Sequence, residues 1–188
     1  FPQVAVTGIC NDRIGNIWVA ASDNIIKLTK GDVHSPLLIE RFSNDPIQSI
    51  ISGKDGNVWI ATAHGLARYG TNGRLVRFPE ERIPDAPVIS LYEDREGSLW
   101  VGTLTGGLNR FRDAVFSTIT DVDGLSGNYV RSIIETKDGA LWIATSNGLT
   151  RLQNNIYLTY NTRNGLSSTN PITALFEDRE GSLWIGGA

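Results

Sequence analysis

Residues 93–102 read EDREGSLWVG and residues 177–186 read EDREGSLWIG, so a single Val/Ile exchange separates two ten-residue stretches. The tryptophan in each stretch belongs to a longer series. All five tryptophans of the 188-residue chain follow one spacing, with gaps of 41, 41, 42 and 42 residues: Trp18, Trp59, Trp100, Trp142 and Trp184. A repeat of about 40 residues is typical of arrays of small supersecondary units that bury their faces against one another.

Alignment of the copies on tryptophan gives columns of constant character. The residue before Trp is aliphatic in every copy, the residue after it is Val or Ile, and the next one is Ala or Gly. Asp stands six residues before Trp in three copies, as Asp12, Asp94 and Asp178. Glycine stands three residues before Trp in every copy, and a glycine in that place predicts a turn with positive φ: Gly15, Gly56, Gly97, Gly139 and Gly181.

Each copy contains four short segments of β-rich composition. In the third copy VISLYED and SLWVGT flank the glycine turn and predict a hairpin, and GLNRF and VFSTIT supply a third and a fourth strand. No segment of useful length shows a helical period, so the sequence predicts an all-β fold with little helix. A single four-stranded sheet cannot bury both faces. We therefore expect a β-propeller of four-stranded antiparallel blades, with a tryptophan from each copy wedged between neighbouring blades.

The spacing assigns the whole chain, residues 1–188, to a single propeller segment of about four and a half blades. The repeat units are predicted at 4–44, 45–85, 86–127 and 128–169, with a partial unit at 170–188.

The repeat unit, V-x-S-L-x-x-D-x-x-G-S-L-W-V-G-T-x-x-G-G-L-x-R-F, resembles the two-component-regulator propeller repeat over the whole chain. It departs from that pattern in the first copy, where Asn24 and Lys27 replace Gly and Arg. It also departs in the second and fourth copies, where GKDG and TKDG replace D-x-x-G. WD repeats fit less well because no tryptophan here is followed by Asp.

The resemblance implies a seven-bladed ring that forms the periplasmic input region of a hybrid two-component or related inner-membrane receptor. It further implies a membrane helix and a histidine kinase or diguanylate cyclase output, which these residues do not contain. The implied ligand is a carbohydrate, and the implied full receptor is a homodimer. Contact with the membrane is expected only through segments outside these residues.

Composition and charge indicate which other classes of partner to expect. Seventeen basic and twenty acidic residues give a net charge of −3 with no basic stripe, so nucleic acid is not an expected partner. No run of 18 apolar residues is present. The one cysteine, Cys10, excludes an internal disulfide, and it aligns with apolar residues of the other copies, so we interpret it as a core residue.

The sequence predicts no catalytic residue, no cofactor and no metal site. His34 and His64 lie in different copies without a recurring partner, and no signature of a metalloprotease, serine hydrolase or P-loop is present. Carboxylates of the EDRE turns could act as acid and base or bind Ca²⁺, but their recurrence favours a solvated structural turn. The recurrent cation after the Gly-Leu pair is predicted to join blade to blade through a turn acid, with an anion site as the alternative: Lys27, Arg68, Arg110 and Arg151.

Binding is expected where the copies differ, because loops on a rigid frame carry specificity. Loops between the second and third strands open on the same face as the connectors between copies. The candidates there are Asp23, His64, Thr105, Asn128, Tyr129, Asn147 and Asn170. Amides, hydroxyls, carboxylates and an aromatic ring suit a small polar ligand such as an oligosaccharide. The alternatives are a propeller lyase or glycoside hydrolase, and a protein-interaction scaffold.

Overall fold

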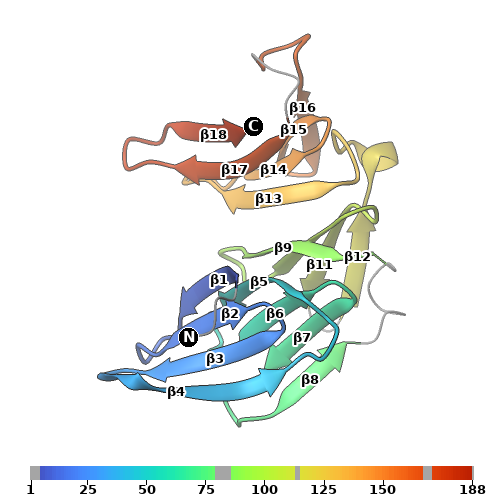
Figure 1. Ribbon diagram of the computed structural model, residues 1–188. Coiled ribbons are helices and arrows are strands. Elements are labelled where there is room, and N and C mark those ends of the chain that lie inside the picture. Colours follow the sequence, from blue (N-terminus) through green and yellow to red (C-terminus); the bar gives the residue numbers. More distant parts are fainter. Residues whose placement is uncertain (1–4, 79–85, 113–114, 167–170, 188) are drawn as a thin grey trace. The chain divides into compact units, whose positions relative to one another are not determined.

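The computed structural model describes residues 5–78, 86–112, 115–166 and 171–187, and it is an all-β structure (Figure 1). The described residues form eighteen strands, β1 to β18, and a short 3-10 helix, η2 (Asp121–Asp123). The chain divides into two compact units, Phe1–Glu93 and Asp94–Ala188, which we call the first and second unit.

The first unit contains two four-stranded antiparallel sheets and one further strand. Each sheet runs in chain order, so neighbouring strands are joined by short turns. The last strand of the unit, β9 (Val88–Glu93), lies against β5 and β6. The sheets are β1 (Val6–Asn11), β2 (Ile17–Ala21), β3 (Asn24–Thr29) and β4 (Asp32–Arg41), followed by β5 (Ile47–Ser52), β6 (Val58–Thr62), β7 (Gly65–Tyr69) and β8 (Leu75–Phe78).

The second unit repeats this pattern. Its strands pair antiparallel in chain order as three strands, then four, then a two-stranded hairpin. These are β10 (Leu99–Thr103), β11 (Leu108–Arg112) and β12 (Val115–Ile119); β13 (Val130–Glu135), β14 (Leu141–Thr145), β15 (Gly148–Gln153) and β16 (Ile156–Tyr160); and β17 (Ile172–Glu177) and β18 (Leu183–Gly187).

Within each unit, the first strand of a sheet packs against the preceding sheet. Strand β5 lies against β1 and β2, β13 lies against β10, and β17 lies against β13 and β14. The aliphatic column twelve residues before Trp is buried at these junctions, whereas its first member, Val6, is 55% exposed. This stacking of four-stranded sheets, together with the near absence of helix, confirms the predicted class of β-propeller blades. The buried members are Ile47, Val88, Val130 and Ile172.

A small residue also stands ten residues before Trp in every copy. In four copies it pairs with the small residue two after Trp, as Gly8 does with Ala20 and Ala174 with Gly186. A Cβ atom built on Gly8 would lie 2.9 Å from the side chain of Ile50 in the next sheet. Small residues are therefore required at this junction because a larger side chain would push the two sheets apart.

The glycine three residues before Trp occupies the turn between first and second strands, as predicted. Its φ lies between 80° and 89° in all five copies, which favours glycine because an L side chain is strained there. The glycine N–H donates to the carbonyl three residues earlier, as from Gly97 to Asp94 at 3.0 Å.

The tryptophans follow the prediction in part. Trp18, Trp59 and Trp100 are buried, and Trp142 is half-buried. The Trp18 ring reaches the next sheet, where it lies 5.2 Å from the ring of Tyr69. The expectation is wrong for Trp184, a residue that is 63% exposed, because only two strands form its sheet in the described part of the chain.

This difference in burial predicts unequal effects of the same substitution. Trp100→Ala should lower the free energy of unfolding by about 3–5 kcal/mol, because it removes a ring that is only 6% exposed and leaves a cavity. Trp184→Ala should cost about 1 kcal/mol or less, because solvent already reaches that ring. Urea denaturation of both variants measures the difference, and equal losses would contradict the burial pattern.

Candidate functional site

The recurrent aspartate of the first hairpin turn holds both the turn and the tryptophan. One oxygen of Asp94 accepts the N–H groups of Glu96 and Ser98, at 3.0 and 2.8 Å. The other accepts the indole N–H of Trp100 at 2.7 Å. Asp12 and Asp178 make the same indole contact in their copies, at 3.0 and 2.7 Å. The carboxylate is therefore engaged in the repeat itself rather than offered to a ligand.

These hydrogen bonds favour the ionised carboxylate. Bonds from the Trp184 indole and the Ser182 N–H lower the pKa of Asp178. Burial raises the pKa of Asp12, but the bonds from Trp18 and Asn16 outweigh it, so the net change is downward. Carboxylates that hold their charge in this way are poorly suited to act as general acids near neutral pH.

The GKDG and TKDG turns replace this arrangement with a carboxylate two residues later. In the fourth copy Thr136 accepts the indole N–H of Trp142 at 3.2 Å, and its hydroxyl donates to Asp138 at 2.6 Å. The hydrogen bonds from Thr136 and Arg151 lower the pKa of Asp138 to about 2. In the second copy Asp55 accepts the N–H of Asn57 at 2.9 Å. The departures from D-x-x-G therefore preserve a carboxylate-capped turn.

In the third and fourth copies the recurrent cation after the Gly-Leu pair binds groups of its own sheet, so the prediction that it joins blade to blade is wrong there. The Arg110 guanidinium lies over the Trp100 ring at 5.3 Å and donates to Ser98 of the same hairpin. Arg151 lies over Trp142 at 5.8 Å and pairs with Asp138 at 2.7 Å. In the first four copies a cation of the same sheet thus lies over the indole ring.

A second recurrent pair, absent from the sequence interpretation, does join neighbouring sheets. Glu93, Glu135 and Glu177 stand seven residues before Trp, and a basic residue stands five before it in every copy. Each of these glutamates accepts the backbone N–H of the basic residue in the preceding copy: Lys54 at 2.6 Å, Arg95 at 2.8 Å and Lys137 at 3.0 Å.

The basic side chains complete this inter-sheet contact. Arg95 donates to the carbonyls of Thr136 and Lys137 in the next turn, at 2.9 and 3.0 Å. Lys137 donates in the same way to the carbonyl of Asp178 at 3.0 Å. The two columns were visible in the sequence, but their partners are backbone groups that spacing alone does not reveal.

The lone cysteine is consistent with its interpretation as a core residue. Burial, followed by the charge of Asp12, raises the pKa of Cys10 to about 11. A thiol with such a pKa is protonated at neutral pH and is a poor nucleophile.

The loops between second and third strands lie against the connectors in both units. The N–H of Ile47 donates to Ser22 at 2.8 Å, that of Ala63 donates to Pro46 at 3.0 Å, and that of Ser146 donates to Tyr129 at 3.1 Å. The residues predicted to bind a ligand therefore lie on loops that are held in place by backbone hydrogen bonds.

In the first unit, the two candidate residues bind different neighbours. Asp23 accepts hydrogen bonds from Arg41 at 3.1 Å and from Asn24 at 2.8 Å. His64 lies 2.9 Å from Asp45, measured from Nδ1 to Oδ1, and its side chain is 65% exposed. His64 and Asp45 therefore form a solvent-accessible pair that the sequence interpretation did not join.

In the second unit, the candidates are partly engaged by the fold. Asn128 donates to Asp121 at 2.9 Å and accepts its N–H at 2.8 Å. Tyr129 lies under the Arg131 guanidinium at 4.1 Å. Asn147 packs beside Gly127: a Cβ atom on Gly127 would lie 3.0 Å from the side-chain amide nitrogen of Asn147. Thr105 is exposed, and Asn170 lies outside the described residues.

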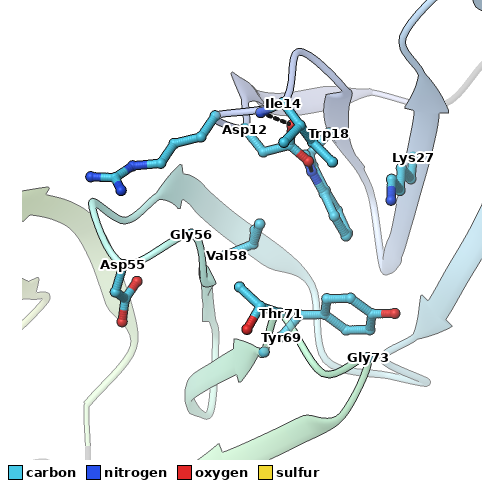
Figure 2. Close-up of a pocket in the computed structure, with 12 residues that line it drawn as sticks. Asp12, Ile14, Trp18, Lys27, Asp55, Gly56, Val58, Tyr69, Thr71 and Gly73 are labelled. Carbon is cyan, nitrogen blue, oxygen red and sulfur yellow. Dashed lines mark hydrogen bonds between the residues drawn. The ribbon is translucent and has the colours of Figure 1, made fainter.

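The first unit also contains a pocket of about 370 Å³ that the sequence interpretation did not foresee. It lies at the hairpin-turn end of the strands, between the first and second sheets. Figure 2 shows the Trp18 ring pointing toward Tyr69, with Lys27 beside it. The side chains that give the pocket its chemistry are Asp12, Arg13, Lys27, Asp55, Tyr69 and Thr71. Its volume is typical of a small-molecule site.

Two further observations bear on the kind of site. In the part of the chain that the structure describes, no group of three or more His, Cys, Asp or Glu residues is placed to hold a metal ion. Among the same residues, no helix has the length and apolar character needed to cross a bilayer.

The fold and these repeated turns define a β-propeller. The family model described as two component regulator propeller matches residues 41–64, 82–105, 124–147 and 165–188, which together make up more than half of the chain. The chain belongs to this family.

Solved structures with the same fold include extracellular domains of putative two-component systems and lyases. The extracellular domain of the putative hybrid two component system BT4673 from B. thetaiotaomicron is 22% identical, with a TM-score of 0.77 over 100% of this chain and 26% of that one. A catalytically inactive virginiamycin B lyase from Staphylococcus aureus with quinupristin is 16% identical. Its TM-score is 0.79, over 97% of this chain and 63% of that one.

This chain spans only 28% and 63% of the first matching structures, a putative one component system and a lyase. At such identities the likeness establishes the fold alone. No curated protein matches the sequence at a significant level.

The lowered pKa of Asp138 predicts a pH dependence of stability. This pKa falls from an unperturbed 3.8 to about 2 on folding, so its stabilising contribution is present above pH 3.8 and is lost as the pH falls toward about 2. Asp138→Asn should therefore flatten the dependence of unfolding free energy on pH across this window. Urea denaturation between pH 2 and 6 measures it, and an unchanged slope would contradict the assignment.

Proposed function

We propose that this chain is the extracytoplasmic ligand-sensing propeller of a bacterial signal-transduction receptor. The observation that carries the proposal is the family match over more than half of the chain. The likeness to extracellular domains of putative one-component and hybrid two-component systems supports it at the level of the fold.

The structural roles of the recurrent charged residues also favour a binding function over a catalytic one. The recurrent aspartates, glutamates and arginines hold turns, indoles and neighbouring sheets. The residues that vary between copies are therefore the ones available to bind a ligand. They include exposed or half-buried amides and hydroxyls at Asn147, Thr105 and Asn128. Such groups suit the hydroxyls of a carbohydrate, which is the ligand that we propose.

In this proposal the chain acts in the periplasm, as part of the input region of an inner-membrane receptor. Ligand binding changes the packing of two receptor copies and shifts the population of dimer arrangements. The output is a histidine kinase or diguanylate cyclase in the longer protein.

Calorimetric titration with a panel of glycans tests the ligand class. A glycan should release heat on binding, and Thr105→Ala or Asn147→Ala should weaken its affinity by about tenfold, because each removes a hydrogen-bonding group. Ser117→Ala, on an exposed position of β12, serves as the control and should leave affinity unchanged. Heat with another class of compound and none with any glycan would contradict the carbohydrate assignment.

A second candidate function is a propeller lyase or glycosidase. The exposed His64–Asp45 pair, at 2.9 Å, is the observation that favours it, because a carboxylate can orient a histidine as a general base. Product formation on incubation with polysaccharides, lost in His64→Ala and kept in His34→Ala, would establish this function in place of non-catalytic sensing.

A further inference from the structure

The first copy lacks a carboxylate that other copies use to neutralise their recurrent cation. Glu96 and Asp138 stand four residues before Trp, where they approach Arg110 at 3.5 Å and Arg151 at 2.7 Å. In the first copy this position is Ile14, which is 71% exposed. Lys27, which occupies the place of those arginines, lies over Trp18 at 5.3 Å. Its charge therefore has no turn carboxylate opposite it.

The second copy lacks the glutamate that joins later sheets to their predecessors. Ser52 stands in the place of Glu93, Glu135 and Glu177. The basic residue that such a glutamate would meet is Arg13, which occupies the same place in its copy as Arg95 and Lys137. The junction between the first two sheets has thus lost two carboxylates that the repeat provides elsewhere.

Both cations left by these losses line the pocket of the first unit. Among the described residues, neither Arg13 nor Lys27 forms an ion pair. The two acids of the lining accept hydrogen bonds from neutral groups and form no ion pair with either cation among the described residues: Asp12 accepts from Trp18 and Asn16, and Asp55 accepts from Asn57. Two cations without an ion-pair partner beside one cavity favour an anionic ligand.

We propose that this pocket binds a sugar that carries a carboxylate, such as a uronic acid unit. The positive charges of Arg13 and Lys27 attract the carboxylate into the pocket. The hydroxyl groups of Tyr69 and Thr71 bind ring hydroxyls, and Trp18 with Tyr69 forms the apolar wall (Figure 2). This inference rests on the proposed carbohydrate-sensing function, but it assigns a site at the opposite end of the strands from the variable loops.

Titration of the intact chain with glucuronate, glucose and glucose 6-phosphate tests the assignment. Glucuronate should bind, and glucose should bind at least about tenfold more weakly, because it lacks the charge-assisted contacts. Arg13→Gln and Lys27→Gln should each weaken glucuronate binding by about tenfold or more. Arg163→Gln, an exposed position of the second unit, changes the net charge equally and should have no effect.

Two variants restore the residues of the other copies and separate lost binding from lost folding. Ser52→Glu and Ile14→Glu supply the missing carboxylates, so each should lower glucuronate affinity while the melting temperature stays the same or rises. If both variants kept full affinity with a folded chain, the proposed role of Arg13 and Lys27 would be wrong.

The remaining outcomes distinguish the two proposals. Glucuronate binding that is insensitive to Arg13→Gln and Lys27→Gln, or tighter binding of glucose 6-phosphate, would overturn the site assignment. A neutral glycan that binds when glucuronate does not would overturn this inference and leave the sensing function in place. Failure of every glycan, neutral or acidic, would overturn both.

Discussion

The hydrogen bond from a buried indole to a hairpin carboxylate is the interaction on which this structure depends. A buried indole N–H needs an acceptor, and a turn of this kind needs a group to bind its free N–H donors. Asp94 meets both needs with its two oxygens, and Trp100 in turn packs as the core of its sheet. One residue pair thereby couples turn geometry to packing, which explains why tryptophan and the turn glycine recur together at a spacing of 41 or 42 residues.

The contacts between neighbouring sheets are likewise made by residues at fixed positions of the repeat. Glutamates at the end of the first strand in the last three copies bind backbone N–H groups of the preceding copy's turn, and basic side chains bind backbone carbonyls of the following turn. These contacts use backbone groups, which are present in every copy, so they tolerate variation elsewhere in the unit. Departures from the pattern are then informative: where Ile14 and Ser52 replace acids, the frame persists and two cations remain beside a pocket.

Most of the fold could be predicted from the sequence because every copy meets the same environment. The positive φ of the turn glycines and the burial of the aliphatic column both follow from repetition at fixed positions. Repetition alone did not predict the exposure of Trp184, which has the sequence context of a buried residue but lies in a sheet for which the described residues provide two strands. It also could not show that Arg110 and Arg151 cover their own indoles, because a fixed spacing does not distinguish contacts within a sheet from contacts between sheets.

The candidate site was less predictable. The choice of loops rested on variability, and the structure shows that Asn128, Asp23 and His64 already have partners there. The pocket was not predicted from the sequence because its lining residues lie in turns that recur in every copy. Only the absence of two carboxylates, at Ile14 and Ser52, distinguishes these turns from the others.

A double-mutant cycle of Asp94→Ala and Trp100→Phe, followed by urea denaturation, tests the central interaction most directly. The account predicts a coupling free energy of about 1.5–3 kcal/mol, the value expected for a hydrogen bond to a charged group. Strictly additive losses would show that the carboxylate and the indole act independently, and would contradict it.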